Sequence, residues 1–330
     1  MAIKVGINGF GRIGRYFTRM AIDDSALEIV AINDLADAPT LAHLFKYDSV
    51  HRQFNGTVNS SNSTLIINGK TIQIFNERDP ENIPWGDFGV DIVVESTGIF
   101  RTKKLASKHL TAGAKKVILS APPKDDQIPS VVLGVNDHIL TGQEKIISNA
   151  SCTTNSAAPL VKVMKTLGNI ESCFITTIHS YTSDQKLHDA PHRDLRRARA
   201  AAESIVPTTT GAAKAITKIF PELDGLMGGC GIRVPVPDGS LTDMTFIVDN
   251  NLTVHTINKA FKQASETDLK GLLYYMEDPI VSRDIIGSPY SSTFDSQLTS
   301  VIGKMVKVVA WYDNEAGYSN RLLDLIKQVG

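Results

Sequence analysis

The sequence predicts an α/β protein of two domains: a doubly wound parallel sheet, then an α+β domain with a mixed, mainly antiparallel sheet. A length of 330 residues suits two domains, at about 100 to 200 residues each. Up to about Asn149, short apolar runs alternate with helix-like stretches, which is typical of a parallel sheet. Beyond Asn149 the apolar runs become longer and more sheet-like, which indicates a second domain with its own sheet.

The first domain begins with a predicted strand at Ile3–Ile7, a glycine turn, a helix and a strand at Leu27–Ile32, which together form a βαβ unit. The pair Asn68-Gly69 is a strong hairpin signal, so we expect an antiparallel insertion in this sheet. The hairpin strands and the other elements are predicted at Thr64–Ile67, Thr71–Ile74, Val90–Val94, Lys116–Leu119, Val131–Val135 and Ile146–Ile147, with a helix at Lys103–Thr111.

The second domain begins with a helix predicted at Cys152–Leu167. Its strands are predicted at Phe174–Ile178, Ile232–Val236, Thr242–Val248 and Val306–Trp311. The segment Ser180–Pro207 is long, polar and rich in arginine, and loops of that length are usually functional or lie at interfaces. We expect domains at residues 1–150 and 151–314, with a C-terminal helix at 315–330 that packs back on the first domain.

The composition excludes several classes of protein. With 34 Lys and Arg against 35 Asp and Glu, the chain lacks the basic excess of dedicated nucleic-acid or membrane-surface binders. Its three cysteines form no CxxC pair, so neither a disulfide framework nor a metal site is indicated. No stretch approaches the roughly 20 apolar residues of a membrane span. We expect a soluble protein of the cytoplasm.

The first strand leads into a GxGxxG motif formed by Gly9, Gly11 and Gly14, directly before a predicted helix. In this position Gly9 allows a tight turn, Gly11 lets the backbone approach a pyrophosphate, and Gly14 lets helix and strand pack closely. The motif expects an acidic residue about 20 residues further on, which would bind the adenosine ribose hydroxyls. Asp34 meets that expectation and favours NAD over NADP. A plain glycine turn, with Asp34 as a helix cap, is the alternative to this Rossmann-type site.

Cys152 lies at the start of the helix that follows the last strand of the first domain, within the polar run NASCTTN at Asn149–Asn155. The N–H groups and dipole of a helix N-terminus lower a thiol pKa and so favour the reactive thiolate. We therefore predict a nucleophile. The alternative is a small buried cysteine, which is what we expect of Cys173 and Cys230.

A cysteine nucleophile usually needs a base. His179 ends a strand-like run and opens a polar segment, where α/β proteins tend to place site residues. From the residues alone, a structural histidine at a strand end is equally consistent. We expect the other histidines to be structural or to lie in a solvated or interface loop: His43, His51, His109, His138, His255, His188 and His192.

Several motifs together resemble the phosphorylating glyceraldehyde-3-phosphate dehydrogenase family over essentially the whole chain. They are INGFGRIGR at Ile7–Arg15, ASCTTN at Ala150–Asn155, the arginine-rich loop, TGAAKA at Thr210–Ala215 and WYDNEAGYS at Trp311–Ser319. The resemblance implies oxidation of glyceraldehyde 3-phosphate with NAD and inorganic phosphate to 1,3-bisphosphoglycerate. It further implies that Cys152 attacks the aldehyde, that His179 takes the proton of the resulting hydroxyl, and that a thioester forms.

The resemblance also implies further site residues. Thr182 and Arg233, with Arg197 nearby, would hold the substrate phosphate, for which the planar donors of arginine are suited. Asn314 would hold the nicotinamide carboxamide. The inorganic phosphate would be bound by Ser151, Thr153, Thr210 and Gly211, and the remaining cofactor contacts would be Arg12, Ile13, Arg78, Thr97 and Ser120. The family is tetrameric, so a homotetramer is implied.

Two departures from the family pattern bear on this interpretation. Many members carry a second cysteine where this chain has Ser156. Ala190 resembles members that accept both cofactors, whereas Pro191 is the NAD-type residue, so slight NADP use stays open. The alternatives are the related erythrose-4-phosphate dehydrogenase and a non-catalytic NAD-sensing or RNA-binding protein on the same fold. A cofactor-free thiol hydrolase would leave the glycine motif unexplained.

Overall fold

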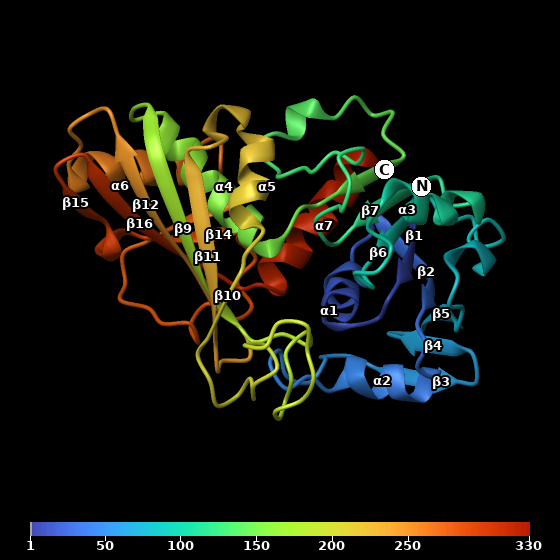
Figure 1. The fold of residues 1–330 in the computed structure, drawn as a ribbon. Helices are drawn as coiled ribbons and strands as arrows, with labels where there is room; N and C mark the ends of the chain where they lie inside the picture. The colour runs from blue at the N-terminus through green and yellow to red at the C-terminus, as the bar shows by residue number, and fades with distance from the viewer. Residues whose placement is uncertain (1) are drawn as a thin grey trace. The chain divides into compact units, whose positions relative to one another are not determined.

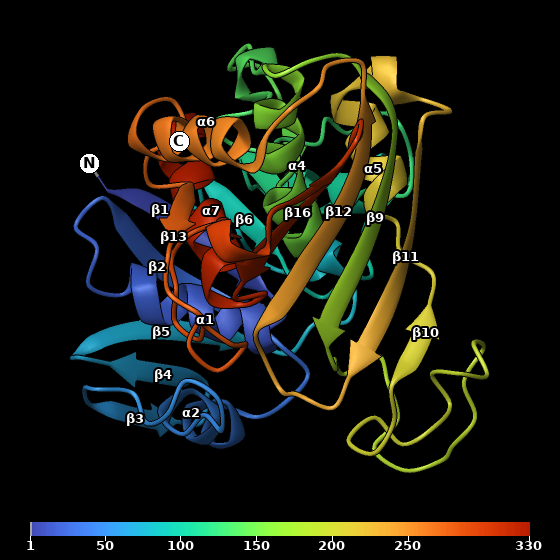
Figure 2. The same ribbon diagram turned by 90° about the vertical axis from the view of Figure 1, so that its left-hand side faces the viewer.

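The computed structural model describes residues 2–330, which form two compact units (Figures 1 and 2). Unit 1 contains the chain up to Val131, together with His138–Ala150 and Ser319–Gly330. Unit 2 contains Val132–Asp137 and Ser151–Tyr318. The chain passes from one unit to the other between Ala150 and Ser151, directly before Cys152.

Unit 1 is built on an eight-stranded sheet in the order β3-β4-β5-β2-β1-β6-β7-β8. Its strands are β1 (Ile3–Asn8), β2 (Leu27–Asn33), β3 (Val58–Ser61), β4 (Thr64–Ile67), β5 (Lys70–Phe75), β6 (Ile92–Glu95), β7 (Lys116–Leu119) and β8 (Ile146–Ser148). Its helices are α1 (Arg12–Ala21), α2 (Ala38–Lys46), α3 (Lys103–Thr111) and most of α7 (Ala316–Val329). The strands from β5 to β8 are parallel, and the hairpin strands β3 and β4 run antiparallel.

The strand order reverses beside β1. The chain leaves β1 for β2 on one side and later returns to β6 on the other, so the carboxyl ends of β1 and β6 flank a topological switch point. In doubly wound sheets, ligands bind at this place because the loops diverge there and leave room. The GxGxxG motif follows β1 and therefore lies at the switch point.

Apolar strands and helix faces bury the core of unit 1. Trp85, Val90 and Val93 lie in one cluster of fully buried side chains, and Ala106 of α3 packs with Ile128 in another. Leu322 of α7 is 0% exposed, and Ser319–Gly330 belong to this unit, so the apolar stripe of the C-terminal helix is buried here. Among residues 2–330, no helix is both long and apolar enough to span a membrane.

Unit 2 is built on a second sheet, in the order β10-β11-β9-β12-β16-β14-β13, with β15 paired to β16. Its strands are β9 (Ile170–Ser180), β10 (Val206–Thr208), β11 (Met227–Val234), β12 (Ser240–Val248), β13 (Leu273–Met276), β14 (Ser292–Asp295), β15 (Ser300–Ile302) and β16 (Met305–Tyr312). Its helices are α4 (Cys152–Lys165), α5 (Ala212–Ile219) and α6 (Val254–Glu266). Two of the strand pairs, β11 with β9 and β13 with β14, are parallel and the others antiparallel.

The helices of unit 2 contact the sheet, and the strands alternate between buried and half-buried residues. Along β12, Met244 and Phe246 are fully buried, whereas Thr245 is half-buried. On β9 the same alternation buries His179 and leaves Phe174 49% exposed on the other face. The side chain of His179 therefore lies on the covered face of the sheet, where α4 also packs.

The predicted fold class is confirmed: a doubly wound sheet, and a second, mixed and mainly antiparallel sheet with its own helices. The strand predicted at Val131–Val135 is wrong. Ser130, just before this run, forms an isolated bridge to Ser148, and the chain then turns through Gly134, whose φ is +74°. The amides of Val135 and Asn136 donate to Val132 O, so this apolar run is a tight turn rather than a strand.

Candidate active site and cofactor-binding edge

Two of the three glycines of the GxGxxG motif lie where a side chain would collide with the backbone. Gly9 has a φ of +94°, and a methyl group there would come within 2.8 Å of Thr97 N. A methyl group on Gly14 would collide with the carbonyl oxygen of Gly9. Gly11, in contrast, faces open space, and it caps α1 without any side-chain hydrogen bond. The open cradle at a helix N-terminus fits a dinucleotide pyrophosphate.

Asp34 follows β2 at the same edge of the sheet. Its Oδ2 accepts a hydrogen bond of 2.7 Å from the amide of Phe10, and its Oδ1 accepts one of 3.0 Å from the amide of Ala36. The first bond ties the end of β2 to the turn after β1, so the carboxylate and the glycine turn keep a constant spacing. A carboxylate has about four acceptor positions, so Asp34 can still accept ribose hydroxyls.

The other cofactor candidates lie at the same edge or near it. Arg12 and Ile13 begin α1, and Arg78, Thr97 and Ser120 follow β5, β6 and β7. Arg12 forms an ion pair of 2.6 Å with Asp48. Burial would raise the pKa of Asp48, but the bonds from Arg12 and from the His51 and Val50 amides lower it to about 2.

The thiol of Cys152 lies at the first turn of α4. Ser151 caps this helix, because its Oγ accepts a hydrogen bond of 3.0 Å from Thr154 N. The cap places Cys152 as the first helical residue. Its Sγ lies 3.4 Å from Nε2 of His179, which is 6% exposed on β9. The structure thus brings together the two residues that the sequence singled out for catalysis.

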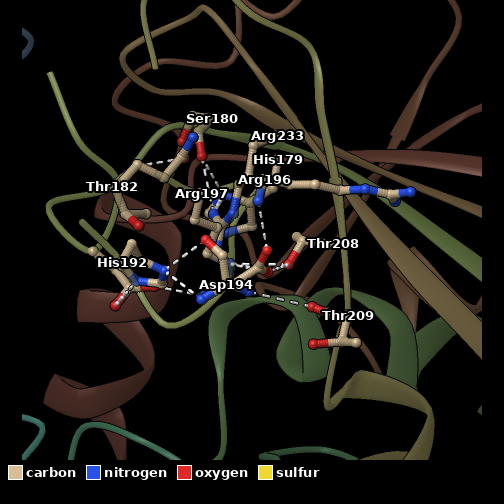
Figure 3. A network of polar contacts seen from close by, with 12 residues as sticks. His179, Ser180, Thr182, His192, Asp194, Arg196, Arg197, Thr208, Thr209 and Arg233 are labelled. Carbon is tan, nitrogen blue, oxygen red and sulfur yellow. Dashed lines mark hydrogen bonds and ion pairs between the residues drawn. The ribbon is translucent and has the colours of Figure 1, made fainter. Parts of the chain in front are cut away.

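Arg233 completes this cluster from the neighbouring strand. It lies opposite His179 in the register of β11 and β9, and its Nη1 donates to Ser180 O at 2.9 Å (Figure 3). The same Nη1 is 2.5 Å from Nδ1 of His179, and Nδ1 is 2.8 Å from Ser180 O. A protonated Nδ1 would donate to Ser180 O, which leaves Nε2 free to accept a proton; a bare Nδ1 would accept from Arg233 instead.

Burial and the charge of Arg233 lower the pKa of His179 to about 3. The imidazole is therefore neutral near pH 7, as a proton acceptor must be. Burial raises the pKa of the Cys152 thiol, while Arg233 and Thr153 act in the opposite direction. The expectation that the helix N-terminus lowers this thiol pKa is wrong, because desolvation of the sulfur outweighs the helix N–H groups and the cation.

Arg233 and Arg197 differ in their charge environment. Arg197 forms an ion pair of 2.5 Å with Asp184, lies 3.5 Å from Asp194, and donates from Nε to Thr208 at 2.9 Å. Within the described residues, no carboxylate lies within ion-pair distance of Arg233. A half-buried cation that no carboxylate contacts, next to a thiol, is suited to bind an anion. Thr182 follows β9, half-buried, in the loop that also carries Arg197.

The candidate residues for the second anion lie at two helix N-termini. Gly211 caps α5 without a side-chain bond, and Thr210 Oγ1 accepts from Ala212 N at 3.2 Å. Ser151 and Thr153 lie at the start of α4. The hydroxyl of Thr153 bonds to the OH of the buried Tyr312, and the backbone N–H of Thr153 lies in the first turn of α4.

Asn314 follows β16 and is held by two hydroxyls. The Oγ atoms of Ser180 and Ser240 donate to its Oδ1, at 2.9 and 2.7 Å. With Oδ1 occupied twice, the amide N–H₂ remains as the group that Asn314 presents as a donor.

Tyr312 is a site residue that the sequence reasoning missed. Its OH bonds to Oγ1 of Thr153 at 2.9 Å and of Thr177 at 3.0 Å, and its ring packs edge-on against His179, with centroids 5.9 Å apart. Tyr312 thus connects α4 to β9 and covers the imidazole. The signal was its place at the end of a strand, two residues before Asn314, but a strand tyrosine is more often simply part of the core.

Comparison with known proteins identifies both units. Residues 3–103 match the family described as glyceraldehyde 3-phosphate dehydrogenase, NAD binding domain, and residues 151–314 match its C-terminal domain. The chain is 56% identical over 327 residues to glyceraldehyde-3-phosphate dehydrogenase of Geobacillus stearothermophilus, covering 98% of this chain and 97% of the relative. It is 54% identical over 333 residues to glyceraldehyde-3-phosphate dehydrogenase 2 of Streptomyces avermitilis, covering 100% and 99%.

Proposed function

Because the chain belongs to the glyceraldehyde-3-phosphate dehydrogenase family, we infer that it is an NAD-dependent enzyme that oxidises glyceraldehyde 3-phosphate. Inorganic phosphate is the second substrate and 1,3-bisphosphoglycerate the product. The observation that carries the residue assignment is the 3.4 Å approach of Cys152 Sγ to His179 Nε2, beside the unpaired cation of Arg233. A nucleophile, a neutral base and an anion-binding group are the parts that this reaction needs.

We propose the following covalent steps for these groups. As Sγ of Cys152 bonds to the aldehyde carbon, the thiol proton passes through Nε2 of His179 to the carbonyl oxygen, which becomes a hydroxyl. Nε2, neutral again, then takes the proton of this hydroxyl. NAD supplies a hydride acceptor, and loss of hydride from that carbon leaves a thioester on Cys152. A phosphate oxygen then attacks the thioester carbonyl, and the carbon–sulfur bond breaks to release the thiolate. Because burial raises the thiol pKa, we assign activation of Cys152 to passage of its proton through His179 while the carbon–sulfur bond forms, and to the charge of Arg233.

We assign the two phosphate sites by charge. Arg233, with Thr182 and Arg197, would bind the substrate phosphate, and Arg233 would contribute most because its charge is not already neutralised. Ser151, the N–H of Thr153, Thr210 and Gly211 would bind the attacking phosphate.

The cofactor would lie along the edge of unit 1. The cradle at Gly11 and the first turn of α1 would hold the pyrophosphate, and Asp34 the adenosine ribose. Arg12, Ile13, Arg78, Thr97 and Ser120 would be further contacts. The N–H₂ of Asn314 would donate to the nicotinamide carboxamide, in the orientation that Ser180 and Ser240 impose.

We further propose a homotetramer in the cytoplasm. The outer face of the second sheet exposes Phe174, and the loop Ser180–Pro207 exposes Leu187, Leu195 and Ile205, which are 69 to 81% exposed. Exposed apolar groups of this size favour burial against further copies of the chain. Three free cysteines fit a reducing compartment.

Absorbance at the NADH band, with glyceraldehyde 3-phosphate and NAD, tests the function. We expect NADH to form only when phosphate is present, and Cys152→Ala to lower the rate by about 10⁴-fold or more while NAD still binds. Cys173→Ala is the matched control, because that thiol is buried and burial raises its pKa to about 12. Turnover without phosphate would indicate a hydrolysing relative, and an active Cys152→Ala variant would overturn the assignment.

A further inference from the structure

A buried polar network joins the strand ends that carry the candidate cofactor contacts in unit 1. Its centre is Glu95, the last residue of β6, which is 2% exposed. Oε1 of Glu95 accepts hydrogen bonds from the amide of Thr97 at 2.9 Å and from the Thr97 hydroxyl. Oε2 accepts from Nδ2 of Asn8 at 2.6 Å and contacts Nε2 of His109 at 3.0 Å.

The indole of Trp85 decides the tautomer of His109. Trp85 Nε1 can only donate, and it lies 3.0 Å from Nδ1 of His109, so Nδ1 is the acceptor. Nε2 of a neutral imidazole then carries the hydrogen and donates to Glu95. All four groups that contact the Glu95 oxygens are thus donors, so both oxygens of this buried carboxyl group are satisfied as acceptors.

The same network reaches β2. Asn33, the last residue of that strand, donates from Nδ2 to Oδ1 of Asn8 at 2.7 Å. Asn8 immediately precedes Gly9, and Asn33 immediately precedes Asp34. A single carboxylate therefore ties together the ends of β1, β2 and β6, and through them the glycine turn, Asp34 and Thr97.

We propose that Glu95, oriented by His109 and Trp85, is a positioning residue for NAD: it sets the spacing of the glycine turn, Asp34 and Thr97. This inference rests on the proposed cofactor role of that edge. Glu95 faces Thr97, Asn8 and His109 and acts through the first two. A site whose supporting groups are lost becomes loose although its contact residues are all present.

Glu95→Gln tests the proposal with little change in volume. Whichever way the amide turns, its N–H₂ faces two donors, either those of Thr97 or those of Asn8 and His109. We expect KM for NAD to rise by about ten-fold or more, as for a lost hydrogen bond to a charged group. kcat at saturating NAD and KM for glyceraldehyde 3-phosphate should stay within about two-fold, since Glu95 lies in a different unit from the thiol.

Two pairs of variants sharpen the test. If Glu95 acts through Thr97, then Glu95→Gln with Thr97→Val should raise KM for NAD no more than Glu95→Gln alone. His109→Gln can still accept from Trp85 and donate to Glu95, so it should retain a near-normal KM for NAD. His109→Leu removes both bonds and should raise KM for NAD. If Glu95→Gln fails to fold, the two His109 variants test the proposal in its place.

Ile128→Ala is the control for lost stability, because Ile128 packs in the other core cluster and has no part in the network. It should lower Tm without changing KM for NAD. The proposal would be overturned if Glu95→Gln, like Ile128→Ala, lowered only Tm. It would also be overturned if the effects of Glu95→Gln and Thr97→Val on KM for NAD multiplied in the double variant. Failure of the wild-type chain to bind NAD would instead contradict the proposed cofactor role.

Discussion

Each unit buries a histidine, and the two environments differ in a way that separates a positioning role from a chemical one. His109 lies between a donor, Trp85, and an acceptor, Glu95, so both ring nitrogens are satisfied and one tautomer is favoured. His179 faces a thiol at Nε2 and shares Nδ1 between Ser180 O and a cation. A fully paired ring stabilises geometry, whereas a ring next to an unpaired charge and a nucleophile can exchange a proton.

His179→Asn should have the largest effect among the changes that test this contrast. Loss of the base should lower kcat by about 10² to 10⁴-fold in the NADH assay. The pH profile of thiol alkylation by iodoacetamide should also shift. His109→Gln is the matched change at the other buried histidine and should leave kcat near normal; equal losses at both positions would remove the distinction.

The same substitution should change the pH dependence of stability. The folded pKa of His179 lies near 3, below the ordinary 6.5, so between these pH values the ring binds a proton in the unfolded chain but not in the folded chain. Stability from the neutral ring is therefore present above pH 6.5 and lost as pH falls toward 3, by roughly 1 kcal/mol for each pH unit. Urea unfolding at pH 7 and pH 5 should show a smaller drop for His179→Asn than for the wild type.

Arg233→Leu should remove the positive charge that lies beside His179 and Cys152. We expect KM for glyceraldehyde 3-phosphate to rise by about 100-fold, because an unpaired arginine donor to phosphate is lost. The thiol pKa should rise further, so alkylation of Cys152 at pH 8 should slow. Arg199→Leu is the control, since Arg199 is exposed and already paired with Asp189 at 2.8 Å; similar losses in both variants would indicate only a general effect of charge.

Asp34→Ala should have a smaller effect, confined to the cofactor. Without the carboxylate, discrimination against NADP should weaken by about ten-fold, since an acid at this position repels a 2′-phosphate. The ratio of kcat/KM for the two cofactors measures it. An unchanged ratio would move cofactor choice to Ala190 and Pro191.

Tyr312→Phe should have the smallest effect on turnover. It retains the ring against His179 but removes the OH between Thr153 and Thr177, at a cost of about 1 to 3 kcal/mol in the free energy of unfolding. The rate should fall by less than about ten-fold. A much larger loss of kcat with unchanged stability would give the hydroxyl a direct role in the chemistry.

Local patterns were enough to predict much of the fold. Alternating apolar runs and the Asn68-Gly69 turn predicted the doubly wound sheet and its hairpin, because short-range periodicity reports directly on secondary structure. The strand predicted at Val131–Val135 was wrong, because apolar content alone does not separate a strand from a buried turn. The glycine motif and Asp34 were predictable because each depends on the backbone near its own strand.

The sequence by itself determined which residue types were available for chemistry: a cysteine at a helix start, a histidine at a strand end and a glycine turn after the first strand. Only the tertiary structure decided how they combine. It brings Sγ of Cys152 to 3.4 Å from His179, leaves Arg233 unpaired beside them and raises rather than lowers the thiol pKa. Burial, charge pairing and the partners of Glu95 all depend on residues far apart in the chain, and no local pattern carries that information.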